Sequence, residues 1–145
     1  GFLVTIGLCV EKKPQMPKRK LEIFHQENSA WIRTLDFMEQ ESAYMKNRLS
    51  KVLDAYHSPE LLDWAEQYQN KILLNEEAIN LLKQDIHIQE KRLASEYLFD
   101  GHPLKDEIVH NQERLRMQMD YVETDFYAMK KAFNDYLTHH ILQHI

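Results

Sequence analysis

The 145-residue sequence contains only one cysteine, three glycines and four prolines. Because a disulfide needs two cysteines, Cys9 rules out an intrachain bridge and leaves the redox compartment undetermined. The glycines stand apart at positions 1, 7 and 101, so the chain has no glycine-rich loop of the kind that cradles phosphate. So few turn-forming residues argue against a sheet protein with many strands. No apolar run approaches the roughly 20 residues needed to cross a bilayer as a helix.

Basic residues are outnumbered by acidic residues beyond the first 20 positions. Residues 1–20 hold five Lys or Arg and one Glu, a net charge of +4; because the whole chain carries −5, residues 21–145 carry −9. Nucleic-acid binding relies on clustered Lys and Arg that neutralise phosphates. The acidic body therefore argues against DNA or RNA as a partner. We expect a cytoplasmic location.

Heptad spacing, in contrast, is abundant. From Pro59 to Phe99 the chain shows apolar residues every three then four positions, typical of one long amphipathic helix. Ser58 can cap this helix, and Asp100-Gly101-His102-Pro103 ends it. Similar patterns run from about 18 to 56 and from about 103 to 144. The sequence thus predicts an all-α fold, a long antiparallel up-down-up three-helix bundle over residues 18–145 with coiled-coil-like packing and an N-terminal arm at 1–17.

The predicted arm joins a short apolar run, residues 2–10, to a basic stretch with prolines, residues 11–20. We expect it to fold onto an apolar surface of the bundle. Two alternatives stay open: a secretory or lipoprotein signal with Cys9 as the lipidated residue, or initiation at Met16 with the first fifteen residues as upstream sequence. Membrane contact is expected only through this arm, if at all.

Short connections make consecutive helices antiparallel, so the numbers of facing residues have a constant total. In the first hairpin, two facing residues have numbers that add up to the same total as the numbers of Ser58 and Pro59 at the turn. In the second hairpin, the total is set in the same way by Asp100 and Gly101. Both registers place apolar residues opposite one another. The predicted pairs include Phe24 with Leu93, Leu35 with Leu82, Leu49 with Tyr68, and Leu82 with Met119.

The same registers align the polar exceptions. Asn28, Gln89 and Gln112 fall at one level, and Ser42 falls opposite Asn75. An unpaired buried amide costs about 1–3 kcal/mol, so matching the amides in one layer removes a penalty. We expect a structural layer that fixes helix register. An ordered water or small ion held by the amides is the alternative.

A second apolar stripe occupies the c positions of the first two helices, roughly 130° from the core direction. Leaving large apolar side chains in water forgoes roughly 1.5–3 kcal/mol each. We therefore expect a cover, with a second copy of the chain as the favoured occupant and a dimer as the result. Another helical protein, the N-terminal arm, or a thick core that half-covers these positions are the alternatives. The candidate partner-binding residues are Ile23, Phe37, Tyr44, Leu74, Leu81 and Ile88.

Two Glu-x-x-His pairs lie near one end of the predicted bundle, a spacing found in ferritin-like di-iron sites. Such sites use four helices and further inward Glu residues, and both Glu residues here lie off the apolar pattern. We therefore predict no metal and no cofactor, and keep a metal-binding bundle as the alternative function. The candidate ligands are Glu22, His25, His87, Glu90, Glu107 and His110.

Covalent chemistry also lacks a signal, because Cys9 lies in an apolar run without basic neighbours that would lower the pKa of its thiol. The sequence predicts a non-enzymatic interaction or scaffold protein. We expect it to self-associate, or to bind a partner helix, through an apolar face of the first two helices.

Overall fold

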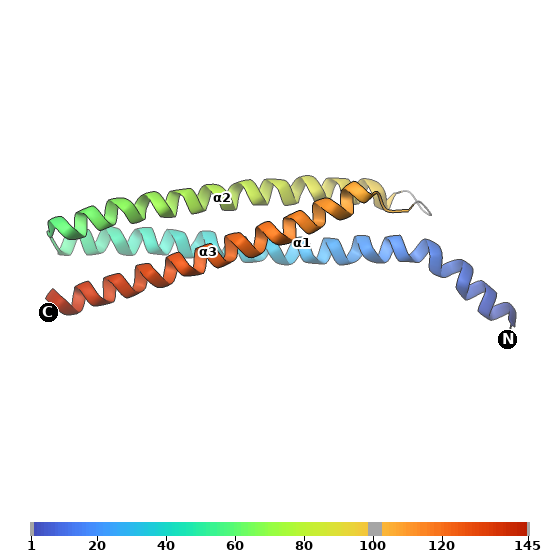
Figure 1. The fold of residues 1–145 in the computed structure, drawn as a ribbon, viewed down its shortest axis with the longest axis horizontal. Helices are drawn as coiled ribbons and strands as arrows, with labels where there is room; N and C mark the ends of the chain where they lie inside the picture. Colours follow the sequence, from blue (N-terminus) through green and yellow to red (C-terminus); the bar gives the residue numbers. More distant parts are fainter. Residues whose placement is uncertain (1, 99–102, 145) are drawn as a thin grey trace.

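The computed structural model describes the backbone of residues 2–98 and 103–144, and the side chains of residues 18–98 and 103–141. It contains three helices over these ranges and no strand: α1 (Phe2–Ala55), α2 (Pro59–Tyr97) and α3 (Asp106–His144). They form the predicted antiparallel bundle, in which α3 crosses the α1/α2 pair obliquely (Figure 1). The all-α three-helix architecture is confirmed. Within the described ranges, no helix is both long enough and apolar enough to cross a bilayer.

The helix ends follow local signals. Ser58 has an extended backbone (φ −103°, ψ 132°), and its hydroxyl accepts a hydrogen bond from the N–H of Leu61 at 3.4 Å, so it caps α2 as expected. At α3, the carbonyl of Lys105 accepts from the N–H groups of Ile108 and Val109 at 3.0 and 3.3 Å. The helix therefore begins at Asp106, later than the proline at 103 suggested.

The arm predicted at residues 1–17 lies where α1 is already helical from Phe2. Its side chains are outside the described residues. The regular part of α2 ends at Tyr97, close to the predicted end at Phe99, and residues 99–102, which include most of the predicted stop at 100–103, are outside the described residues. Docking of the arm on the bundle therefore stays a prediction.

The core follows the predicted heptad positions in three clusters along the bundle. Residue pairs predicted from the register share a cluster, including Phe24 with Leu93 and Leu49 with Tyr68. Leu82 shares the central cluster with Leu35 of α1 and Met119 of α3. These shared clusters agree with both hairpin registers, and the hydrogen bond between Gln89 and Gln112 confirms the second.

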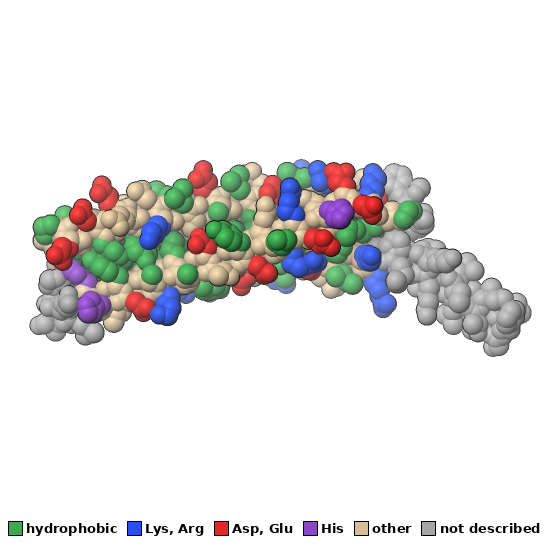
Figure 2. Space-filling view, viewed as in Figure 1, with side chains coloured by type: hydrophobic (Ala, Val, Ile, Leu, Met, Phe, Trp, Pro, Cys, Tyr) green, Lys and Arg blue, Asp and Glu red, His purple; other side chains and the backbone are tan. Residues whose placement is uncertain are grey.

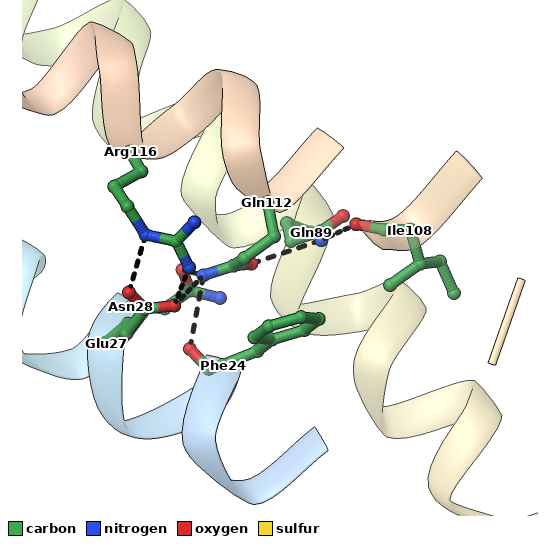
Figure 3. A network of polar contacts seen from close by, with 7 residues as sticks. All are labelled: Phe24, Glu27, Asn28, Gln89, Ile108, Gln112 and Arg116. Carbon is green, nitrogen blue, oxygen red and sulfur yellow. Dashed lines mark hydrogen bonds and ion pairs between the residues drawn. The ribbon is translucent and has the colours of Figure 1, made fainter. Parts of the chain in front are cut away.

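The amide layer lies beside the end cluster that contains Phe24, and Figure 3 shows it from close by. Gln89 Nε2 donates to the Ile108 carbonyl at 3.0 Å and to Gln112 Oε1 at 3.2 Å, and Gln112 Nε2 donates to Asn28 Oδ1 at 2.9 Å. All three amide side chains are fully buried. Asn111 Nδ2 completes the layer by donating to Gln89 Oε1 at 2.7 Å. The predicted alignment of three amides is confirmed.

The second polar level behaves differently. Ser42 and Asn75 are both buried, as facing core residues would be. Within the described chain, however, neither Ser42 Oγ nor Asn75 Oδ1 has a hydrogen-bond partner. This level therefore carries an unsatisfied polar cost that the amide layer largely avoids.

Candidate functional site

The groove between α1 and α2 is bridged by charged side chains. The ammonium group of Lys83 donates to Asp36 and Glu39, and its hydrogen bond to Asp36 raises the pKa of Lys83. Exposed pairs of this kind contribute little each, but together they occupy the groove. The contacts across it are Lys83 with Asp36 and Glu39, Lys46 with Glu76 at 2.8 Å, and His25 with Glu90 at 2.9 Å.

The groove between α1 and α3 is bridged in the same way. Arg116 forms a bidentate pair with Glu27 at 2.7 and 2.9 Å, and this hydrogen bonding raises the pKa of Arg116 (Figure 3). Lys130 pairs with Glu41 at 2.9 Å. Further along, Arg48 donates to Asn134 Oδ1 at 2.8 Å. Polar contacts between helices thus cross both grooves beside α1, although a hollow of about 370 Å³ remains between α1 and α2 beside His25 and Glu90.

The third groove, between residues 68–85 of α2 and 114–132 of α3, is different, and we name it the α2/α3 groove. No ion pair crosses it in the described chain. Two hollows of about 430 and 560 Å³ run along it and share Ala78 as a lining residue, and Ala128 and Ala132 also line it. Small side chains leave room that larger ones would fill, so this side of the bundle is open.

Large apolar side chains stand along the α2/α3 groove. Leu74 and Leu81 line it from α2, and Met117 and Tyr121 from α3, the last two being 73% and 75% exposed. Figure 2 shows hydrophobic side chains gathered between α2 and α3 toward the end where α3 terminates. Exposed apolar patches of this kind are typical of interaction sites.

An aromatic cluster closes this end of the groove. The Trp64 ring stacks on Tyr136 with centroids 4.0 Å apart and also contacts Tyr68 at 4.6 Å and Phe133 at 5.5 Å. Burial raises the pKa values of the Tyr68 and Tyr136 hydroxyls. The cluster packs Trp64 and Tyr68 of α2 against Phe133 and Tyr136 of α3 and so holds the two helices together at this end.

The predicted partner-binding residues are all between 47% and 66% exposed, but they form two stripes. Ile23, Phe37 and Tyr44 each lie one turn before an α1 residue that bonds to α3, so they follow the α3-facing flank of α1. Leu74 and Leu81 line the α2/α3 groove, and Ile88 continues their seven-residue spacing along α2 beyond the hollows. The apolar surface of the first two helices is therefore divided, with one stripe on each side of α3. The six residues are Ile23, Phe37, Tyr44, Leu74, Leu81 and Ile88.

The candidate metal ligands do not gather into a site. His25 Nδ1 lies 2.9 and 3.0 Å from the two carboxylate oxygens of Glu90, and Glu107 lies 3.9 Å from Arg92. The others, Glu22, His87 and His110, are exposed. Among the described side chains, no three His, Cys, Asp or Glu residues are placed to hold one metal ion.

The contribution of α3 to the surface was not predicted from the sequence. The α2/α3 groove is lined from α3 by Met117, Tyr121 and Asp125. From the sequence, we predict a second, exposed apolar stripe only for the first two helices. A signal existed, because Arg114, Tyr121 and Ala128 recur at seven-residue spacing on one flank of α3.

Known proteins offer no guide: no family model, curated protein or solved structure matches this sequence. Function is therefore inferred from the surface of the chain itself.

Proposed function

We propose that this chain is a non-enzymatic helical interaction or scaffold protein that self-associates, as a homodimer with coiled-coil-like contacts, or binds a partner helix. The observation that carries the proposal is the exposure of six large apolar side chains on α1 and α2 at positions that flank the core. Covering a side chain that is about half to two-thirds exposed contributes roughly 1–2 kcal/mol. Because these side chains form two stripes on opposite sides of α3, covering either stripe favours association with another helical surface.

A structural role for the polar groups supports the non-enzymatic part. The amides of the core layer are engaged in hydrogen bonds with one another and with the backbone. Charged groups along the two α1 grooves are engaged in ion pairs. These contacts fix register and helix pairing, which a rigid interaction surface requires.

Sedimentation velocity over a wide concentration range tests the proposal. The wild-type chain is expected to sediment as a dimer or larger species at micromolar concentrations. A variant with Phe37, Tyr44, Leu74 and Leu81 replaced by Gln is expected to be monomeric with unchanged helicity, because all four side chains are exposed. A wild-type chain that is monomeric at every concentration contradicts self-association and leaves only the partner helix.

A further inference from the structure

We infer that a second copy of this chain docks on the α2/α3 groove, antiparallel, about a two-fold axis that passes over Ala78. The inference rests on the proposed function and deepens it by naming both the face and its occupant. The α1 stripe of Ile23, Phe37 and Tyr44 stays outside this interface, on the other side of α3.

Charged residues along the α2/α3 groove make no ion pairs among the described residues, unlike those along the other two grooves. Asp85 and Asp125 line the groove, and neither makes an ion pair within the described part of the chain. Lys71 has its ammonium group 5.0 Å from the centroid of the Tyr68 ring and faces no carboxylate at ion-pair distance among the described residues. These charges beside an apolar surface are available to a second molecule.

The apolar area of the groove suits a dimer interface. Leu74, Leu81, Met117 and Tyr121 are each more than half exposed. Together they present on the order of 600 Å² of side-chain surface, close to the roughly 800 Å² per partner of a standard interface. The alanines and the partly exposed Val122 and Met129 can supply the remainder.

The groove is complementary to itself in shape. One face carries both the protruding side chains and the two hollows, which meet at Ala78. In a two-fold dimer the same patch of each copy contacts the other, so protrusions of one copy must fit hollows of its partner. A two-fold axis over Ala78 makes the two copies of α2 antiparallel and sets Leu74 of each copy against the hollow beside the other copy's leucine at position 81.

The charges of α2 obey the same symmetry. Lys71 and Asp85 lie seven residues on either side of Ala78, which corresponds to about 10 Å along the helix in each direction. The two-fold axis therefore brings Lys71 opposite the partner's Asp85, and Asp85 opposite the partner's Lys71. Complementary charges at an interface rim fix its orientation and register.

The α3 side supports the same axis independently. The register shown by the Gln89–Gln112 hydrogen bond places Ala78 level with Glu123. Tyr121 and Asp125 lie two residues on either side of this level, so the axis brings the Tyr121 hydroxyl toward the partner's Asp125 as a hydrogen-bond donor.

Arg114, the remaining charged residue of the groove, fits the arrangement as well. The axis places it opposite the partner's Ala132, a small side chain that leaves room for it. Its guanidinium donates to Asn111 Oδ1 of its own chain at 2.6 Å. It therefore needs no carboxylate from the second copy.

Two neighbouring leucines give a matched first test by sedimentation velocity. Leu74 lines the α2/α3 groove and is 66% exposed, whereas Leu73 is 52% exposed and lies one turn before Glu76, which pairs with α1. Leu74→Asp is expected to raise the dimer dissociation constant at least tenfold. Leu73→Asp is expected to leave it within about threefold of the wild-type value. Circular dichroism checks that both variants keep their helix content.

A charge exchange tests the axis itself. Lys71→Asp and Asp85→Lys, each alone, place like charges opposite one another twice per dimer, so each is expected to weaken dimerisation about tenfold. The double variant exchanges the charges within each pair and is expected to recover most of the wild-type affinity.

The control for the exchange uses a second pair of opposite charges on the same helix. Glu77 and Lys91 are both exposed and have the same separation along α2 as Lys71 and Asp85, but neither lines the α2/α3 groove. They are also not symmetric about Ala78, so the axis does not bring them together. Glu77→Lys, Lys91→Glu and the double variant are each expected to leave the dissociation constant within about threefold of the wild-type value.

The outcomes separate this inference from the proposed function. A strictly monomeric wild type overturns both the inference and self-association. A dimer that responds equally to Leu73→Asp and Leu74→Asp, or whose charge exchange restores nothing, overturns the α2/α3 interface while self-association stands.

Discussion

The hydrogen bond between Asn28 and Gln112 is the best place to test whether the amide layer controls stability. Within the described chain, Gln112→Leu removes the only side-chain donor to Asn28 Oδ1, and Asn28 Nδ2 already has no partner there. The Asn28 amide would then be fully buried with none of its groups paired. In the reverse variant, Asn28→Leu, Gln112 Nε2 keeps Glu27 Oε1 at 3.2 Å, so the loss is smaller.

The two substitutions are therefore expected to be strongly non-additive. Gln112→Leu should destabilise the fold by about 1–3 kcal/mol, the cost of an unsatisfied buried polar group. Adding Asn28→Leu should restore about 1–2 kcal/mol, because it removes the unpaired amide. This recovery corresponds to a rise of about 3–6 °C in Tm for a chain of this size. Urea unfolding followed by circular dichroism at one fixed protein concentration measures all four members of the cycle.

A distant pair provides the control for this cycle. Phe133 belongs to the core cluster near the α1–α2 turn, far from the amide layer. Asn28→Leu and Phe133→Leu should add within about 0.5 kcal/mol. If Asn28→Leu and Gln112→Leu prove equally additive, the amides do not act as one layer, and register must be fixed by apolar packing alone.

Three further outcomes follow from single contacts. Ser58→Ala removes the α2 cap and should cost about 1 kcal/mol in urea unfolding, whereas Ser50→Ala, exposed within α1, should cost less than about half of that; equal costs would contradict the capping role. Tyr136→Leu should destabilise by about 0.5–1.5 kcal/mol beyond the loss of buried area and alter Trp64 fluorescence in a variant lacking the other tryptophan; unchanged emission would mean that the rings are not stacked. Because hydrogen bonding raises the pKa of Lys83 on folding, its contribution is complete at neutral pH and is lost as the pH rises through that raised value. The urea midpoint should therefore fall above about pH 10, and fall less in Lys83→Met; identical pH profiles would refute this.

Much of the architecture could be predicted because its signals are local or periodic. Ser58 and Pro59 mark one turn, and the heptad pattern fixes which residues enter the core. Once the turns are placed, antiparallel numbering sets the register, and the buried amides then meet without further information. The start of α3 was less predictable, since a proline suits a first helical turn but the hydrogen bonds begin only with the Lys105 carbonyl.

The surface could be predicted only in part, for a geometric reason. A c position gives an angle from the core, but it does not say which neighbouring helix lies on that flank. This depends on whether the third helix lies to the left or the right of the first hairpin, and periodicity within each helix is the same for both arrangements. Periodicity alone therefore predicts one face for Phe37 and Leu74, although they lie on opposite sides of α3.

Comparison of charge between helices carries the information that periodicity lacks. Lys83 and Lys46 form ion pairs between α2 and α1, so the flank of α2 that bears Lys83 and Glu76 must face α1. The opposite flank of α2 has an alanine at position 78 and Asp85, which makes no ion pair among the described residues, facing the α3 side of the groove. Larger apolar residues at that flank would bury more area within a single chain. The composition of the α2/α3 groove is the feature on which the proposed contact with a second molecule rests.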